Sequence, residues 1–370
     1  MRRFICLAAC AASLLAGCAT PRQTPAQALR SSAPPAWSIE AKPDHFVVSI
    51  SPARQTLQLV GSTGLLLGSG ISALSNAKHR REMEEALSTF DPGKQIDERI
   101  QTALNEALGA QAKRVTPFDG GVNTKARNDA FAERCRVLRQ AGHEWVLDLQ
   151  TTYGIFGIQG RAVAAVEGTL YETKRGRLHW KDKIAVSPDP ILASDKPGDP
   201  TKPFGFKVSS KLSAEEDAVS RWTTGRGKPL HAAFENATSG IAAALLQDLG
   251  LRTSAEGSYW LGQQALQEKD WERAATLFAQ ALQLEPNMTN AEHGRALAIA
   301  ASGNPQGAVT LTEKMLAANP EDGVAHYNLA WWYAVKLDGA LKAKPHYEAA
   351  IAKGLPHCKD IEKRIEKAGR

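Results

Sequence analysis

The stretch Tyr259–Pro286, YWLGQQALQEKDWERAATLFAQALQLEP, decides the fold of the carboxyl-terminal part of this chain. Its alternation of small and large residues predicts two helices packed as a hairpin, because small residues let two backbones approach while large ones fill the space between them. The small residues are Gly262, Ala274 and Ala281, and the filling residues are Leu261 and Phe278. Pro286 stands at the end of the unit, where a proline stops the second helix.

The same pattern recurs along residues 255–354 with a period of 34 residues, which is the signature of a stacked helical repeat. The second unit is degenerate, since it carries Thr312 in the place of Phe278. The third unit is displaced by one inserted residue ahead of Ala343. Residues 355–370 then predict a last helix with the polar character of a cap, which a stack of this kind needs at its end.

This pattern resembles the tetratricopeptide repeat family, and the first unit matches almost position by position. The resemblance implies three helical hairpins in which the first helix of each lines a concave groove that binds a protein partner. By that register the groove residues are Tyr259, Gln263, Leu266, His293, Leu297, Tyr327, Trp331 and Val335. Of the basic and amide residues by which some family members clamp a carboxyl terminus, only Asn328 is present.

The chemistry of these groove residues predicts the kind of partner. They are aromatic and mostly uncharged, so the groove should prefer an apolar or extended peptide to an acidic tail. A second interpretation stays open, in which Tyr327 and Trp331 pack against the inserted turn or against the preceding domain.

Residues 44–250 mix strand and helix patterns and predict a separate α+β domain. Alternating apolar residues predict a strand from Phe46, a short strand near Val115 and three further strands between positions 145 and 186. A tight turn at 174–176 joins the last two as a hairpin. We therefore expect a mainly antiparallel sheet with helices on one face. The order of elements resembles envelope lipoproteins of the curli-secretion and TolB amino-terminal types.

The first residues are typical of export and lipid attachment. Arg2 and Arg3 precede an uncharged apolar run that ends in LAGC at residues 15–18, an order found in secretory signals too short to span a bilayer. The run resembles the lipobox of bacterial lipoproteins. That resemblance implies removal of residues 1–17, a diacylglycerol on Cys18 and a further acyl chain such as palmitate on its new amine. An ordinary cleaved signal with a chance cysteine is the alternative.

The segment that follows predicts how the protein is attached. Residues 18–43 are rich in proline, alanine and serine and predict a lipidated, structureless tether. Ala19 directly after Cys18 resembles the sorting signal of outer-membrane lipoproteins, which implies an outer-membrane anchor and a chain facing the periplasm.

Residues 55–77 are uncharged and contain Gly64 and Gly68 at a spacing that allows close helix contact. Three interpretations stay open for this stretch: burial against the sheet, a surface that joins identical subunits, and a segment that enters lipid.

Composition and motifs exclude several function classes. The net charge is +6, or +4 once the two signal arginines are removed, and the basic residues are scattered, which argues against nucleic-acid binding. The sequence contains no nucleophile elbow, phosphate loop or His-Glu-x-x-His motif, so we expect no catalytic residues, no metal site and no cofactor. Asp148 and Glu167 are the candidates if an acid–base pair exists. Whether Cys135 and Cys358 are free stays open.

These observations together favour a non-enzymatic, membrane-anchored periplasmic scaffold that binds a protein partner through its repeats. Envelope assembly, secretion or cell-wall synthesis are the tasks that suit such a protein. Two alternatives come from other classes. One is an oligomeric export or pore-forming lipoprotein built from residues 44–250, and the other is an unrecognised cell-wall enzyme that uses Asp148 or Glu167.

Overall fold

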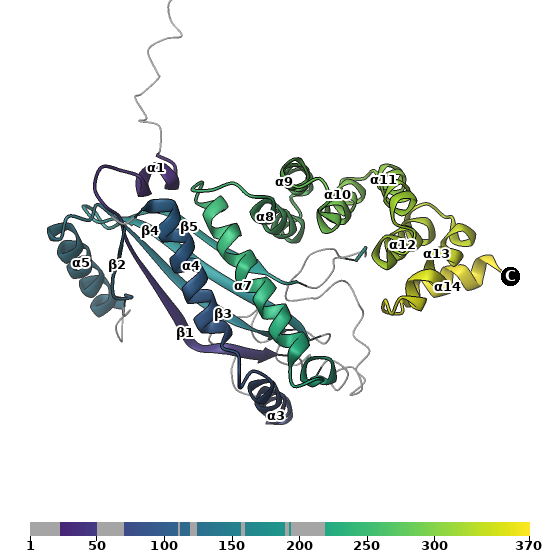
Figure 1. Ribbon diagram of the computed structural model, residues 1–370, viewed down its shortest axis with the longest axis horizontal. Helices are drawn as coiled ribbons and strands as arrows, with labels where there is room; N and C mark the ends of the chain where they lie inside the picture. The colour runs from purple at the N-terminus through teal and green to yellow at the C-terminus, as the bar shows by residue number, and fades with distance from the viewer. Residues whose placement is uncertain are drawn as a thin grey trace, which may run out of the picture.

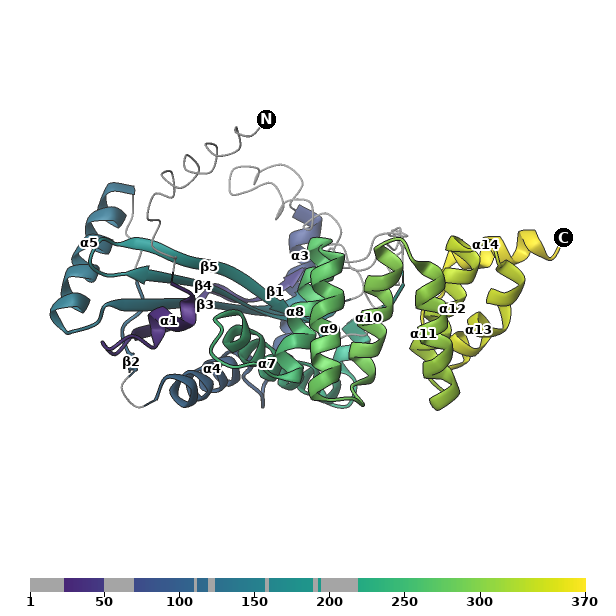
Figure 2. The same ribbon diagram turned by 90° about the horizontal axis from the view of Figure 1, so that it is seen from above.

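The computed structural model describes residues 23–49, 70–109, 112–118, 124–156, 160–188, 192–193 and 219–370. An amino-terminal region that contains a sheet with helices is followed by an all-helical repeat region (Figure 1 and Figure 2). The predicted fold class, an α+β region followed by helical repeats, is confirmed.

The sheet of the amino-terminal region is mixed. Its strands are β1 (Ala36–Ser49), β2 (Lys113–Arg114), β3 (Trp145–Phe156), β4 (Arg161–Glu172) and β5 (Arg177–Val186). Their order is β2-β1-β3-β4-β5, with β3, β4 and β5 antiparallel and β1 parallel to both β2 and β3. The prediction of a mainly antiparallel sheet therefore holds for the hairpin strands alone. Helices separate β1 from β3 along the chain, and such a crossover allows parallel pairing.

The prediction of a structureless tether is wrong from residue 25 onward. Helix α1 (Pro25–Leu29) begins with a capping box between Thr24 and Gln27, and β1 starts at Ala36 rather than near residue 44. Leu29 and Trp37 are fully buried, so this segment belongs to the core. Its prolines are accommodated because they lie at a helix start, just before a strand and within a register irregularity of β1. Residues 1–22, including Cys18, lie outside the described residues.

Two long helices cover one face of the sheet. In α4 (Pro92–Leu108) a buried stripe of Ile96, Ile100 and Leu104 faces the strands, and α7 (Lys228–Asp248) lies alongside (Figure 1). Helix α5 (Thr124–Gln140) lies against one end of the other face, where Leu138 packs with Ala36 and Val146. Most of that second face is left without a helix among the described residues.

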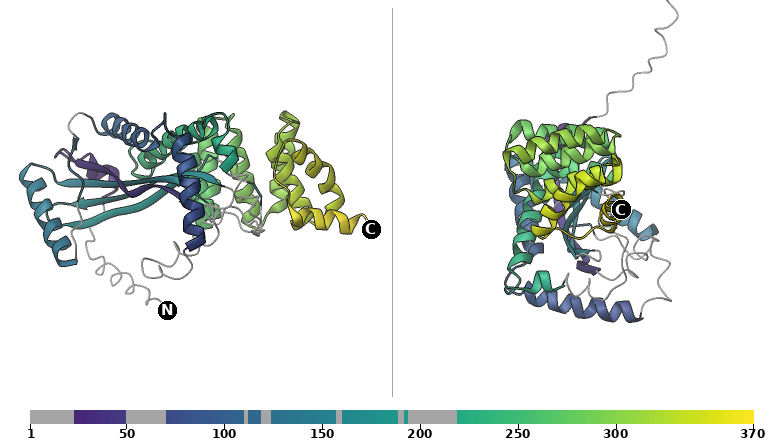
Figure 3. Two further views of the ribbon diagram at one scale, coloured as in Figure 1. Left: turned by 90° about the horizontal axis from the view of Figure 1, so that it is seen from below. Right: turned by 90° about the vertical axis from the view of Figure 1, so that its right-hand side faces the viewer.

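The repeat region contains the three expected hairpins and the cap. They are α8 (Ala255–Glu268) with α9 (Trp271–Leu284), α10 (Thr289–Ala301) with α11 (Pro305–Ala318), α12 (Gly323–Trp331) with η2 (Trp332–Lys336) and α13 (Ala340–Ala352), and the cap α14 (Lys359–Ala368). Figure 3 shows this array stacked away from the sheet, with the carboxyl terminus at its far end. A Cβ at Gly262 would lie 2.9 Å from the Phe278 ring, and one at Gly294 only 2.4 Å from it. The small residues therefore do permit the close helix contacts that the pattern predicts.

The inserted residue of the third repeat has a structural counterpart. Segment η2, directly after α12, is a π-helix, the form in which a helix takes up one extra residue without breaking. The insertion therefore leaves the hairpin intact, and α13 still buries Ala343, Tyr347 and Ala350 against its neighbours.

The two regions share one hydrophobic core. The predicted boundary at residues 250–255 does fall in the turn between α7 and α8, yet buried residues of both helices belong to one continuous cluster. Gly240 on α7 lets the Trp260 ring of α8 approach to a distance that a Cβ would not allow. The repeats are therefore built onto α7 rather than attached by a linker.

The stretch at residues 55–77 lies mostly outside the described residues. Its described part opens helix α3 (Gly70–Ala86). Among the residues that the structure describes, no helix combines the length and the apolar character needed to cross a membrane. The three interpretations of this stretch stay predictions.

Candidate functional site

The structure places the eight predicted groove residues on the first helices of the three hairpins and on η2, but it does not leave them exposed. All except the half-buried Val335 are at most 6 % exposed. The expectation of an open groove at these positions is therefore wrong. In the first repeat the physical reason is that α7 and β5 pack against α8, and in the third repeat the backbone at Ala193 lies against Asn328. The role of these residues in partner binding stays a prediction.

In the first repeat, the predicted groove residues pack as core. Tyr259 lies against the Trp260 ring at 4.6 Å between centroids, and its hydroxyl accepts a hydrogen bond from Gln263. Burial raises the pKa of Tyr259 to about 12, although Gln263 and Arg161 act in the opposite direction. Helix α8 also packs against α7 and β5, which joins this end of the array to the sheet region.

The second and third repeats are joined by a buried contact between a histidine and a carboxylate. His293 Nε2 on α10 lies 3.0 Å from Asp322 Oδ2, and both side chains are more than nine-tenths buried. Burial alone would raise the pKa of Asp322, but hydrogen bonds from His293 and from the Ala325 amide hold it below its usual value. Asp322 also caps the start of α12, so one carboxylate both stabilises that helix start and contacts His293 on α10. The other ring nitrogen of His293, Nδ1, is buried without a partner.

The third repeat holds a piece of the chain's own backbone. The Ala193 amide donates a hydrogen bond of 2.8 Å to Asn328 Oδ1 on α12. Ala193 is 2 % exposed, and Leu192 beside it is buried as well. The other half of the Asn328 amide, Nδ2, is buried without a partner.

The cap closes the far end of the array. The Cys358 amide donates to the Tyr347 hydroxyl at 2.7 Å, and that hydroxyl donates to Glu362 at 2.8 Å. Both cysteines of the described part, Cys135 and Cys358, are buried free thiols. Burial raises the pKa of Cys135, which keeps that thiol protonated.

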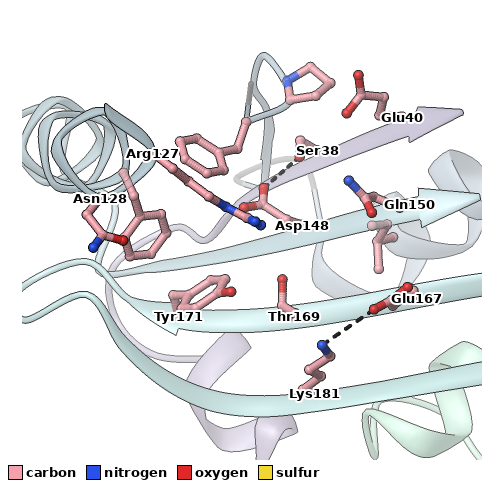
Figure 4. Close-up of a pocket in the computed structure, with 14 residues that line it drawn as sticks. Ser38, Glu40, Arg127, Asn128, Asp148, Gln150, Glu167, Thr169, Tyr171 and Lys181 are labelled. Atoms are coloured by element: carbon pink, nitrogen blue, oxygen red, sulfur yellow. Dashed lines mark hydrogen bonds and ion pairs between the residues drawn. The ribbon is translucent and has the colours of Figure 1, made fainter. Parts of the chain in front are cut away.

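A second candidate site is a cleft of about 340 Å³ on the uncovered face of the sheet (Figure 4). Polar side chains of β1, β3, β4 and β5 form its floor, and α5 with Phe118 forms one wall. Within it Asp148 accepts from Ser38 at 2.6 Å and from both terminal nitrogens of Arg134, one of them at 2.7 Å. Glu167 lies 3.4 Å from Lys181 on the next strand.

This geometry bears on the proposed acid–base pair. Asp148 and Glu167 point into the same cleft, but Asp148 pairs across the strands with Thr169 and Glu167 pairs with Gln150, so the two acids are not opposite each other. Because both oxygens of Asp148 already accept hydrogen bonds, the group anchors α5 and β1 to β3. The arrangement supports a structural role for Asp148.

Reasoning from the sequence missed two of these partners. Arg134 gives no signal, since it is one of many charged residues on a helix. Leu192-Ala193 lies in a stretch with a loop-like sequence, and no periodicity there predicts which part of the fold it packs against. Asn328 was the one visible hint, because it is the only polar amide at the positions matching the family's clamp.

Comparison with known proteins supports the repeat assignment. The tetratricopeptide repeat family model matches residues 265–322, inside the predicted repeat region. No curated protein matches the chain. Among solved structures, the PelC dodecamer from Paraburkholderia phytofirmans is similar over 42 % of this chain and 78 % of that chain, at 13 % identity and a TM-score of 0.19. A likeness at that TM-score carries no argument about fold or function. Residues 265–322 are therefore similar to tetratricopeptide repeats, a type of repeat that serves protein–protein interaction.

Proposed function

We propose that this protein is a membrane-anchored periplasmic scaffold that holds a protein partner through its repeat region. The observation that carries the proposal is the tetratricopeptide repeat array built directly onto an α+β region by one continuous core. A rigid body of this kind fixes the position of a bound partner relative to whatever holds its amino-terminal end.

The anchor in this proposal is the lipid on Cys18, with attachment to the outer membrane suggested by Ala19. The described fold begins with α1 at Pro25, seven positions after Cys18. Seven residues reach at most about 25 Å when fully extended. The folded body would therefore stand close to the membrane surface, rather than at the end of the long tether that the proline content predicts.

The proposal includes the absence of enzymatic activity. It is supported by the engagement of the two cleft carboxylates, Asp148 with Arg134 and Ser38, and Glu167 with Lys181. An acid–base catalyst needs a carboxyl group free to exchange a proton with substrate. These contacts instead join neighbouring elements of the fold.

Fractionation and co-purification of the tagged full chain test this function. We expect the wild-type chain to stay with membranes and to bring down one protein in stoichiometric amount. Cys18→Ser should release the chain and its partner into the soluble fraction. Cys10→Ser, in the signal itself, should leave the chain and its partner membrane-bound. Recovery of the chain alone from membranes would contradict the scaffold, and retention of Cys18→Ser on membranes would contradict the lipid anchor.

A further inference from the structure

Asn328 receives a backbone segment that lies 135 positions earlier in the chain. Its Oδ1 accepts the Ala193 amide at 2.8 Å, and Asn328 itself is completely buried. Leu192 and Ala193 belong to the same hydrophobic cluster as Tyr327 and Trp331 on α12. The Ala193 amide thus meets the one amide side chain at the positions that match the family's clamp for a bound peptide.

The contact uses the acceptor of the Asn328 side-chain amide but not its donor. A primary amide presents one acceptor and one donor group, and a peptide unit can satisfy both. Here Nδ2 is buried with no partner, and His293 Nδ1 on the preceding repeat is in the same state. A buried polar group left without a hydrogen bond destabilises the folded state. The segment at Leu192-Ala193 is therefore an imperfect ligand for the polar groups on this side of the array.

We propose that Leu192-Ala193 is an internal ligand of the repeat array, and that a protein partner binds by replacing it with an extended peptide. The partner would place a small residue where Ala193 lies and supply a backbone carbonyl to Asn328 Nδ2. The unsatisfied groups give the incoming peptide its advantage, because it gains hydrogen bonds that the chain's own segment does not make. This inference rests on the proposed function only in that the partner is a protein.

The covalent attachment of the internal ligand sets how well an incoming peptide competes. A tethered segment acts at an effective concentration of about a millimolar or above. A free peptide with the same contacts should therefore bind the wild-type chain poorly and bind well only when the internal segment is prevented from docking. Self-occupancy predicts this asymmetry, whereas a segment that merely packs against the repeats does not.

A peptide-binding experiment tests the proposal. The probe is a labelled synthetic peptide of residues 187–196, SPDPILASDK, and the receptor is the purified full chain in detergent. The altered receptor carries two substitutions, Leu192→Asp and Ala193→Pro. They disfavour docking of the internal segment, since proline lacks the amide hydrogen that the Asn328 side chain accepts. We expect this receptor to bind the peptide at least tenfold more tightly than the wild-type chain does. The matched control is the peptide SPDPILPSDK, which should lose at least tenfold in affinity.

Further variants assign the binding to the proposed site. Adding Asn328→Ala to the altered receptor should remove the gain. Equal binding to wild-type and altered receptors, or no binding to an altered receptor that unfolds at the wild-type temperature, would overturn the proposal. If the altered receptor does not fold, hydrogen exchange of the single Asn328→Ala chain decides: the Ala193 amide should exchange at least tenfold faster, and unchanged exchange refutes the inference. These experiments use purified components, so their outcome is independent of the co-purification test. The proposed scaffold function can be refuted while the internal ligand is confirmed, and the internal ligand can be refuted while the scaffold function is confirmed.

Discussion

Ionisation of Asp248 opposes folding. Its carboxylate accepts a hydrogen bond of 3.1 Å from Trp180 Nε1, where the end of α7 meets β5. Burial, together with the neighbouring Asp182 carboxylate, raises the pKa of Asp248 to about 6. Between the unfolded value near 4 and this folded value, the native chain binds more protons than the unfolded chain. Stability therefore falls as the pH rises through that window, and the cost is fully present above pH 6.

Replacing Asp248 with Asn should remove this cost. The amide oxygen still accepts from Trp180, and no charge is buried beside Asp182. We expect Asp248→Asn to raise the free energy of unfolding at pH 7 by about 1 kcal/mol, a value discounted for partial exposure. The gain should vanish at pH 4, as measured by urea unfolding at both values. Asp129→Asn, on an exposed part of α5, is the control. An equal gain at the two pH values would rule out ionisation as the cause.

Thr312 is a buried polar residue in the place of an aromatic one. It corresponds to Phe278 and Tyr347 of the other repeats, is completely buried, and its hydroxyl has no hydrogen-bond partner. Valine has nearly the same shape without the unsatisfied hydroxyl. Thr312→Val should therefore increase the free energy of unfolding by about 1 kcal/mol. Thr310→Val on the same helix is the control, since the Thr310 hydroxyl donates to the Gln306 carbonyl at 3.1 Å. A gain of the same size at both positions would count against this explanation.

At the scale of elements, each repeat makes the same backbone turn between its two helices. The equivalent positions are Lys269, Gly303 and Asp338, spaced by 34 and then 35 residues, and all three have a positive φ, of 64°, 98° and 51°. The extra residue of the third repeat lies ahead of the turn, in η2, so the turn itself is preserved. Each hairpin thus uses the left-handed conformation at this position. In two of the three repeats the residue there is not glycine, so its backbone is strained.

This turn predicts opposite effects for opposite substitutions. Lys269→Gly should stabilise the protein by about 0.5 kcal/mol, because relief of the left-handed strain exceeds the entropy that glycine adds to the unfolded chain. Gly303→Ala should destabilise it by about 1 kcal/mol for the same reason. Thermal unfolding of the two variants and of wild type measures both. If Gly303→Ala is neutral, the turn does not need the conformation that the structure gives it.

At the scale of the whole molecule, the sequence pattern predicted those contacts that form between residues close together in the chain. The contact of Gly262 with Phe278 follows from spacing alone. The start of β1 did not follow, because prolines around Trp37 gave a buried strand the composition of a linker. The covering of the groove did not follow either. Asn328 and Ala193 meet across 135 positions, and no local rule relates residues so far apart.

The shared core makes a prediction about how the molecule unfolds. Since buried residues of the sheet region and of the repeats form one cluster through α7 and α8, both should unfold in a single cooperative transition. Gly240 is the sharpest place to test this, because a Cβ there would lie 2.3 Å from Trp260 Nε1 and force the two helices apart.

Gly240→Ala should weaken both regions together. Overpacking costs about 1–3 kcal/mol, and the better helix propensity of alanine offsets about 1 kcal/mol, so we expect a net loss of up to about 2 kcal/mol. Hydrogen exchange read separately on β3 and on α12 should show the same loss in both. Gly369→Ala is the control, since the nearest atom to its Cβ would lie at an ordinary 3.6 Å. Loss of protection in the repeats alone would mean that they fold independently, and the rigid connection on which the scaffold depends would not exist.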